Sequence, residues 1–538
     1  MPPPLDIQIR DTHIVLPYKP VIKPTTTPLS ILDNNCARFS RCAAIWYYYP
    51  PIDSSSQFNQ TTLLTALSHT LNFYRPWCGR LSYTTPPLTT YGPQSTRYQR
   101  LSITYNTSND LGIPCTFASS PHQLADFLPP LHSRRTSSKA WSAADDIDSS
   151  SLLPSTPLSL SSSACSETAP NVLIQVTTFA CGSVAMGIAI THCLADALSL
   201  SRFANDWATL HRSSLLEVGV GYYKETGLPP PNPPPIFNPQ MLDAYAAGDI
   251  NGPPNDELRR KARGLPQHRY DWYTPVEGQP WPNPKPQDFD DVIEAMEDVG
   301  AVLGPTTPIP WSQWDTRCSV SHRILHFSRE EILSIFNTAS STSTSSTPSN
   351  RKIEAVTELK ISKHDALLAH LWSEIIISRC LPEGTTSYLD VTFGIRARVE
   401  PPLPDEYLGS PIMHVAVPST SLGESRTFAA TSSLASRMDK SSMDVVCAAR
   451  QIRAHLSKFG NEEISCILHE RASELAPQRI WGTCLGREHV LLTTWVHSGV
   501  HNVEFLNGCK AVHIEAVVSI PSSVSWLSSE RELQTPRG

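Results

Sequence analysis

The sequence lacks the cysteine patterns that zinc sites and disulfide frameworks require. Its 13 cysteines are scattered, with no Cys-x-x-Cys pair and no neighbouring histidine at metal-ligand spacing. An odd number of isolated cysteines is typical of reduced thiols in a cytosol. The first residues also contain no basic stretch followed by an apolar core, so no secretory signal is predicted. We therefore expect a cytoplasmic protein without a metal or a permanently bound cofactor.

Strong charge of one sign and long apolar runs are also missing. Lys and Arg together number 43 against 50 for Asp and Glu, which gives a net charge of -7 without a basic block. Nucleic acid is therefore not an expected partner. The most apolar run, Val172 to Ile190, is interrupted by Gln175 and by a turn. This run is too broken for a membrane span, so we expect no membrane partner.

The signature motifs of several large enzyme classes are absent. The sequence contains neither G-x-G-x-x-G nor G-x-x-x-x-G-K-[ST], which disfavours nicotinamide-dependent and nucleotide-cleaving enzymes. It also lacks the G-x-S-x-G elbow that presents a nucleophilic serine in many hydrolases. A covalent intermediate on such a serine is therefore not expected.

The length of the chain predicts two domains. Its 538 residues are too many for one ordinary hydrophobic core. Gly227 to Gln240 reads GLPPPNPPPIFNPQ, and consecutive prolines favour a stiff extended spacer. We therefore predict a first domain over residues 1–216, a Pro-rich crossover linker over 217–240 and a second domain over 241–538.

Two stretches rich in Ser and Thr interrupt these domains, at about residues 132–170 and 338–352. Each has too few apolar residues to form a core of its own, so we predict mobile surface insertions. Residues 279–314 are rich in Pro and Trp and show no periodicity, and we predict no regular element there.

The chain is organised around Asn171 to Leu210. Val172 to Thr177 alternates and is rich in β-branched residues, which predicts a strand. Cys181-Gly182 supplies a turn, and Val184 to Ile190 reads as a strand that is buried on both faces. Apolar residues then recur at helical spacing up to Leu210. The pattern indicates a strand, a turn, a strand and a helix.

His192 and Asp196 lie where the second of these strands meets the helix, in an H-x-x-x-D pattern. The pattern has two fixed positions and is weak by itself, and the chain contains another copy at His122 to Asp126 that lacks a preceding buried strand. Two interpretations of His192 stay open on this evidence. It is a core histidine bonded to the backbone, or it transfers protons near neutral pH.

The stretch FACGSVAMGIAITHCLAD, through His192 and Asp196, resembles the HxxxD segment of the BAHD acyl-CoA-dependent acyltransferases. The resemblance is strongest to the fungal branch, which includes trichothecene 3-O-acetyltransferases. It implies an α/β, two-domain fold like that of chloramphenicol acetyltransferase, with mixed sheets flanked by helices and an active site at the domain interface. It also implies a monomer that transfers an acyl group, with acetyl expected, from acyl-CoA to a hydroxyl or amine of a small fungal metabolite.

Further segments in family order extend the resemblance along the chain. ISKHDALLAHLW and GIRARVEPPLPDEYLGS resemble segments that face the coenzyme in the family, and they imply coenzyme contacts. VLLTTW is similar to the strand that ends in T-S-W, and EFLNG occupies the place of the motif DFGWG. The residues that these segments point to are Ser362, Arg396 and Ser410 for the coenzyme, Thr493, Thr494 and Trp495 for the oxyanion, and Glu504 at the divergent motif.

The resemblance implies a general-base mechanism. His192 would take the proton of the acceptor, and a donor from Thr493, Thr494 or Trp495 would stabilise the tetrahedral oxyanion. Asp196 could orient the imidazole, but in the family this carboxylate points away from the site and pairs with an arginine. We therefore expect a structural role for Asp196, with Arg323 as its partner.

Two other interpretations stay open. Condensation domains act on carrier-protein thioesters and share the histidine motif as H-H-x-x-x-D-G, whereas Thr191 and Ala197 stand at the flanking positions here. The altered EFLNG segment is also compatible with a degenerate relative that binds ligands without turnover. The acceptor itself is not identified: Trp281, Trp311 and Trp314 either line its pocket or pack as surface aromatics.

Overall fold

The computed structural model describes most of the chain. The described residues are 5–20, 23–50, 58–84, 92–128, 140–141, 149–160, 168–215, 230–280, 283–297, 303–315, 318, 322–340, 359–382, 384–420 and 434–517. All structural statements below concern these residues.

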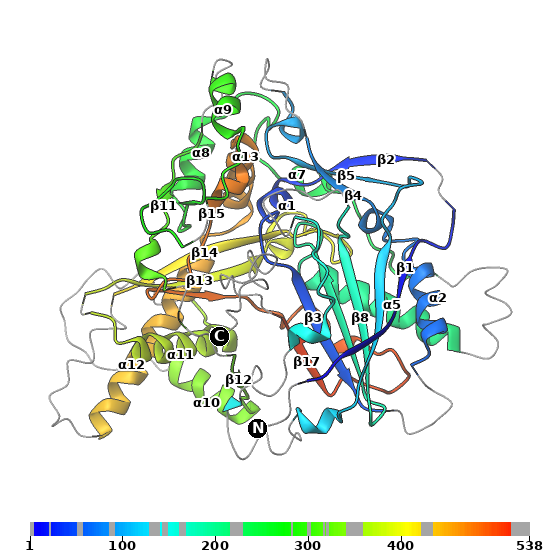
Figure 1. The fold of residues 1–538 in the computed structure, drawn as a ribbon. Helices are drawn as coiled ribbons and strands as arrows, with labels where there is room; N and C mark the ends of the chain where they lie inside the picture. The colour runs from blue at the N-terminus through cyan, green and yellow to red at the C-terminus, as the bar shows by residue number, and fades with distance from the viewer. Residues whose placement is uncertain are drawn as a thin grey trace, which may run out of the picture.

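A six-stranded mixed sheet forms the centre of the first half of the chain (Figure 1). Its middle strands, β8 (Val172–Phe179) and β9 (Val184–Ile190), pair antiparallel through a turn at Gly182, where φ is 79°. Glycine adopts this conformation without strain. The order is β1-β6-β8-β9-β3-β17, with β1 at Gln8–Val15, β6 at Ile113–Ser120, β3 at Cys42–Tyr48 and β17 at His513–Ala516. The strand-turn-strand prediction is confirmed.

Helices α2 (Gln60–Thr70) and α5 (Ala197–Leu215) pack against each other over one face of this sheet. α5 buries Leu200, Phe203 and Trp207, which recur at helical spacing as the sequence predicted. α5 thereby fixes the direction in which the chain leaves β9, and the loop with His192 lies between these two elements.

The opposite face of the sheet is covered by residues 149–160, and this corrects one prediction. Residues 132–170 were expected to form a mobile insertion, but Leu152 and Leu153 are buried in the described part. The packing is close because Gly187 of β9 has no side chain: a Cβ there would lie 2.3 Å from the carbonyl oxygen of Leu152. The prediction was wrong because it used the average, Ser-rich composition of the segment. A few leucines within it pack on the sheet and hold this part in place.

A three-stranded sheet, in the order β14-β13-β16, organises the second half. The strands are β13 (Ser387–Gly394), β14 (Ile412–Ser419) and β16 (His489–Leu492). Helices α10 (Arg329–Ser340), α11 (Lys363–Arg379) and α12 (Leu434–Leu456) lie on one side of it (Figure 1). Leu389, Val391 and Phe393 alternate along β13 and join the core that these helices share.

The other side of this sheet carries polar residues, and it meets α13 (Asn461–Ser473), α8 (Asp256–Arg263) and an extended segment, 266–273. The segment contains β10 (Tyr270–Asp271), which pairs with β11 (Thr307–Pro308) and β15 (Ile480–Trp481). One described helix, α9 (Phe289–Glu297), lies within residues 279–314, where no regular element was predicted. It forms because Phe289, Val292, Ile293 and Met296 bury one face at i, i+3, i+4 and i+7.

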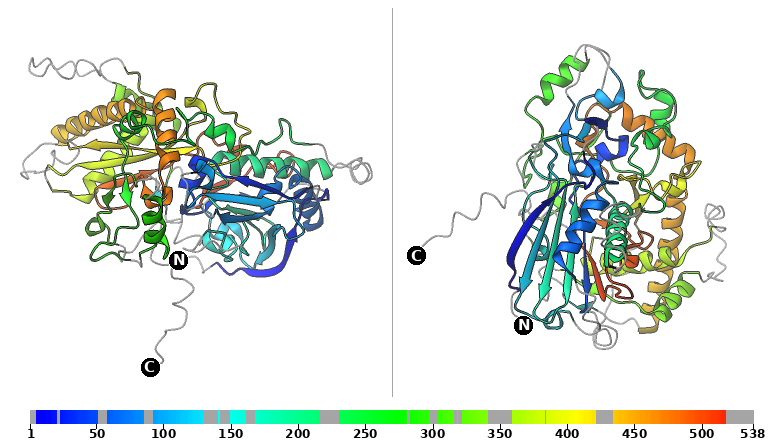
Figure 2. Two further views of the ribbon diagram at one scale, coloured as in Figure 1. Left: turned by 90° about the horizontal axis from the view of Figure 1, so that it is seen from above. Right: turned by 90° about the vertical axis from the view of Figure 1, so that its right-hand side faces the viewer.

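The two halves lie side by side (Figure 2), but the chain crosses between them more than once. β17 belongs to the range 241–538, yet it pairs with β3 in the first sheet. Just before it, the carbonyl of Val500 accepts a hydrogen bond from the indole of Trp46 at 2.9 Å. The domain boundaries stay a prediction, and the last strand is shared across them.

The remaining described elements are short connections around these two sheets. They include the sheet β2-β5-β4 (Thr25–Pro28, Leu101–Tyr105, Arg80–Tyr83), β7 with β12 (Ala140–Trp141, Ile324–Leu325), α1 (Ile31–Asn35) and α7 (Gln240–Asp243). Among the described helices, none combines the length and apolar character needed to cross a membrane. The described cysteines are all free thiols.

Candidate active site

His192 lies in the loop 191–196, which joins β9 to α5 and touches the second half of the chain. The imidazole is partly exposed, whereas its neighbours Cys193 and Leu194 are fully buried. The backbone N–H of Asp196 donates to the carbonyl of Gly409 at 3.0 Å, which ties the loop to residues between β13 and β14. The geometry therefore places an accessible imidazole at the junction of the two sheets.

Ser410 fixes the orientation of this imidazole. Its hydroxyl donates to the backbone carbonyl of His192, and its oxygen lies 3.2 Å from Nδ1 of the ring. A hydroxyl has one proton, and a carbonyl oxygen only accepts. The Ser410 oxygen must then accept from Nδ1–H, which leaves the lone pair of neutral His192 on Nε2. Ser410 was predicted to bind the coenzyme, and the structure places its hydroxyl against His192.

Asp33 holds Ser410 in this position and was missed from the sequence. Its Oδ1 accepts from the backbone N–H of Ser410 at 2.7 Å, and its Oδ2 accepts from the hydroxyl of Ser30 at 2.6 Å. Burial raises the pKa of Asp33 to about 6, despite these hydrogen bonds. The sequence feature that could have drawn attention to Asp33 is the capping-box pattern Ser30-x-x-Asp33 at the start of α1.

Asp196 forms a buried ion pair with Arg396. Nη1 of Arg396 binds Oδ2 of Asp196, and Nη2 lies 3.2 Å from Oδ1. Burial by itself raises the pKa of Asp196, but the guanidinium and hydrogen bonds from Ser199 outweigh it and leave that pKa below its ordinary value. The same guanidinium donates to the carbonyl of Tyr407 at 3.0 Å.

These contacts correct two predictions. The partner of Asp196 is Arg396, from the short helix 396–398, and not Arg323. Arg396 was also expected to contact the coenzyme, but its guanidinium is buried and bound to Asp196, Ser199 and Tyr407. The pair joins the start of α5 to the loop before Ser410, so it stabilises the loop that carries His192.

A second histidine faces the same space as His192. The ring of Phe39 lies 5.6 Å from the ring of His192 and 5.7 Å from the ring of His414, on β14. Burial lowers the pKa of His414 to about 4, and burial also lowers the pKa of His192. Both imidazoles are therefore neutral at pH 7, which is the form that a general base requires. No pattern in the sequence points to His414.

The structure does not bring Glu504 to His192. The hydroxyl of Tyr48 donates to the carbonyl of Val503 at 3.0 Å, so this segment lies at the far end of β3. Tyr48 pairs with Val184, at the opposite end of β9 from His192. β9 has seven residues, so the six steps between its ends span about 20 Å. Oε1 of Glu504 lies 3.9 Å from Nζ of Lys510.

The other predicted residues have local partners. β16 ends at Leu492, two residues before Thr494, whose exposed hydroxyl accepts from the N–H of Val496 at 3.5 Å. Trp495 is half-buried against the core of the first half. Ser362 caps α11, where its oxygen accepts from the N–H of Asp365 at 3.1 Å in a capping box.

Aromatic residues gather beside Phe39. Trp311 and Trp314 stack at 5.6 Å, and Trp314 stacks on Trp481 at 6.0 Å. This cluster also contains Phe39, so it extends toward His192. The packing explains why Trp311 is buried, while the hypothesis that these rings contact an acceptor stays a prediction. Trp281 lies outside the described residues.

Two mixed sheets flanked by helices, with a partly exposed imidazole at their junction, define a two-domain α/β fold. Comparison with known proteins agrees. A model of the Transferase family matches residues 5–262 and 313–523. The chain belongs to this family, that of the BAHD acyl-CoA-dependent acyltransferases, and is an acyltransferase.

Individual relatives are distant but match along most of the chain. Acyltransferase AFT15-1 of Alternaria alternata is 25% identical over 517 residues, covering 93% of this chain and 86% of that protein. Rosmarinate synthase of Plectranthus scutellarioides is 24% identical, covering 70% of this chain and 63% of that protein.

Two solved structures show the same fold. The structure of F. graminearum TRI101 with coenzyme A and T-2 mycotoxin has a TM-score of 0.55 at 12% identity, covering 92% of this chain and 90% of that one. Vinorine synthase has a TM-score of 0.52 at 17% identity, covering 95% of this chain and 89% of that one.

Proposed function

We propose that the protein transfers an acyl group, acetyl first among the donors, from acyl-CoA to a hydroxyl or amine of a small molecule. Family membership supports the acyl transfer, and the coenzyme A in the TRI101 complexes supports the donor. T-2 mycotoxin and deoxynivalenol in those complexes support a fungal secondary metabolite as the acceptor class. A cytoplasmic monomer remains our prediction.

One observation carries the assignment of the base. Ser410 occupies Nδ1 of His192, and the lone pair of neutral His192 is consequently on Nε2. An imidazole in this tautomer can accept a proton at Nε2 but cannot donate one there. Together with its partial exposure, this makes His192 competent to deprotonate an acceptor.

In the proposed reaction, Nε2 of His192 takes the acceptor's proton while the acceptor oxygen or nitrogen attacks the thioester carbonyl carbon. The tetrahedral intermediate then collapses, the C–S bond breaks, and the CoA thiolate takes the proton from the imidazolium. The acceptor keeps the acyl group, and no acyl-enzyme forms. General-base assistance of this kind contributes about 10²- to 10⁴-fold in rate. We propose Thr494 or Trp495 as the oxyanion donor and Ser362 as a coenzyme contact.

The test uses the full chain with a panel of acyl-CoAs and an extract of the source organism. New acylated products are sought by mass spectrometry, and released CoA is titrated as free thiol. The comparison is between the parent, His192→Ala and His501→Gln, a matched change at an exposed histidine. Products are expected from the parent and His501→Gln only.

Other outcomes separate the alternatives. If His192→Ala keeps the parent rate, His192 is not the base. If acyl-CoA binds but no thiol is released with any acceptor, the chain is a degenerate ligand-binding relative. If acyl transfer occurs only from a carrier-protein thioester, the donor assignment is wrong.

A further inference from the structure

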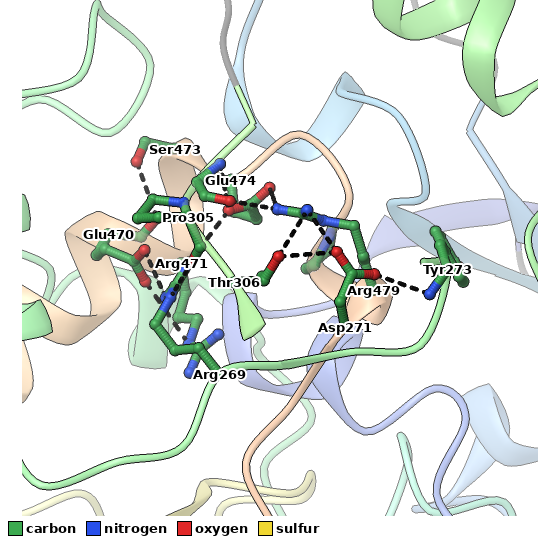
Figure 3. Close-up of polar contacts among 12 residues, drawn as sticks. Arg269, Asp271, Tyr273, Pro305, Thr306, Glu470, Arg471, Ser473, Glu474 and Arg479 are labelled. Atoms are coloured by element: carbon green, nitrogen blue, oxygen red, sulfur yellow. Dashed lines mark hydrogen bonds and ion pairs between the residues drawn. The ribbon is translucent and has the colours of Figure 1, made fainter. Parts of the chain in front are cut away.

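The extended segment 266–273 is anchored on both sides, because successive side chains of a strand point in opposite directions. On one side, Nη1 of Arg269 lies 2.7 Å from Oε1 of Glu470, and Nη1 of Arg479 donates to Asp271 at 2.9 Å (Figure 3). These ion pairs bind the segment to α13 and to the chain that follows it. The alternate residues, His268 and Tyr270, face the second sheet instead.

On the sheet side, His268 meets Asp390 of β13 and His489 of β16. Nε2 of His268 lies 3.1 Å from Oδ1 of Asp390, and Nδ1 of His489 lies 2.9 Å from Oδ2 of the same carboxylate. One ligand atom from each of the three residues lies within 4.8 Å of the others. The three positions are far apart in the sequence, so no ligand spacing marks them as a site.

Two atoms of this cluster have no hydrogen-bond partner among the described residues. They are Nε2 of His268 and Oδ1 of Asp390, which face each other without a ring N–H directed between them. The side chain of Asp390 is 0% exposed and that of His268 is 14% exposed. Leaving two such atoms unsatisfied is costly, whereas one cation between them would satisfy both.

The distance between these atoms suits a metal. Zinc binds nitrogen and oxygen ligands at about 2.0–2.2 Å. At such bond lengths, two ligand atoms 3.1 Å apart subtend an angle at the metal of roughly 95–100°, within reach of a tetrahedral arrangement. His489 would complete the set by turning Nδ1 from Oδ2 of Asp390 toward the ion, since its ligand atom already lies within 4.8 Å of the other two.

The surroundings also resemble those of a metal site. The hydroxyl of Thr483 donates to Oδ2 of Asp390 at 2.9 Å, and the hydroxyl of Tyr270 lies 3.3 Å from Nε2 of His489. Such outer contacts orient ligands, and here they leave Oδ1 of Asp390 for the ion, while Nδ1 of His489 bonds Oδ2 of the same carboxylate.

We propose that His268, Asp390 and His489 form a binding site for a divalent transition metal of the zinc type. Imidazole and carboxylate are ligands that zinc accepts, and water would complete its coordination. The ion would clamp segment 266–273 onto the sheet. Trp272 in that segment stacks on Trp481 at 4.9 Å, in the aromatic cluster that reaches Phe39 and His192. The site would thus stabilise one wall beside the base without taking part in acyl transfer.

The test measures metal and not activity, so it is independent of the proposed reaction. The full chain is freed of metal with a chelator, incubated with Zn²⁺ or Co²⁺, desalted and analysed for metal content. We expect about one ion per chain, a higher Tm with metal, and the visible absorption of Co²⁺ bound by nitrogen and oxygen. His501→Gln serves as the control for binding by exposed histidines.

His268→Gln should lose the metal and the Tm increase while keeping the parent circular dichroism, because His268 lies at the edge of the cluster. Asp390→Asn is the second variant, since it keeps the shape of the buried carboxylate. A parent that retains no metal would overturn the proposal and leave a plain network of hydrogen bonds. Metal content that survives both substitutions would place the ion elsewhere and would overturn it too.

Discussion

The guanidinium of Arg396 binds the carboxylate of Asp196 across 200 residues of sequence. Both side chains are only 9% exposed, so each charge depends on the other. Arg396→Met should therefore leave an unpaired buried carboxylate and lower the free energy of unfolding by about 3–5 kcal/mol. Urea unfolding monitored by circular dichroism measures this loss.

The double variant Asp196→Asn with Arg396→Met separates the cost of an unpaired buried charge from the cost of changed side-chain packing. Because it removes both charges, it should recover part of the stability lost in Arg396→Met. Asp196→Asn by itself should lower stability along with turnover. A variant Asp196→Asn with parental stability and selectively lost turnover would contradict a structural role for this carboxylate.

Removal of the Ser410 hydroxyl should impair catalysis through His192. Ser410→Ala frees Nδ1, so the ring is no longer held in one tautomer and orientation. The loss of a hydrogen bond worth about 1 kcal/mol predicts a fall in kcat/KM of roughly 5- to 10-fold. Steady-state kinetics with a fixed acyl-CoA would show the fall.

A structural effect of that substitution can be distinguished from positioning. Ser410→Thr keeps a hydroxyl and should restore most of the activity, while Ser213→Ala changes a partly exposed serine of α5 and should have no effect. If Ser410→Ala and Ser410→Thr lose activity equally, the hydroxyl is not what positions the ring.

The pH profile should report His192 directly. Burial lowers the pKa of His192 below its ordinary value of 6.5, and the neutral ring is the active form. Activity is therefore lost when the ring gains a proton on acidification. We expect the acid limb of kcat/KM against pH to have its midpoint below 6.5. A midpoint at or above that value would show that the free enzyme stabilises the imidazolium.

The part of the site that could be predicted is the part encoded locally. β8, the turn at Gly182, β9 and α5 are adjacent in the sequence, and their apolar periodicity places His192 between a strand and a helix. The partners of His192 and Asp196 come from other parts of the chain. Asp33, Ser410 and Arg396 meet the loop only after the two halves pack, and no local pattern records that meeting.

The average composition of a segment predicted its structure least well where a few buried residues determine the packing. Residues 149–160 are half Ser and Thr, yet their buried leucines, Leu152, Leu153 and Leu158, help to cover one face of the sheet. The four apolar positions of α9 are similarly diluted by the prolines around them. In both places burial of a few side chains outweighs the average character of the segment.

Gly187 tests this packing. In Gly187→Ala the new methyl group would lie 2.3 Å from the carbonyl oxygen of Leu152 and 2.8 Å from Cδ2 of Leu153, and backbone cannot yield as a flexible side chain can. The cover must shift, which predicts a loss of about 1–3 kcal/mol in unfolding free energy and faster proteolysis within residues 149–160. Gly394→Ala is the matched control, since a Cβ there meets nothing within 4 Å. Equal stability of the two variants would show that residues 149–160 do not pack on β9. A loss of stability confined to Gly187→Ala would establish that residues 149–160 belong to the hydrophobic core of the six-stranded sheet.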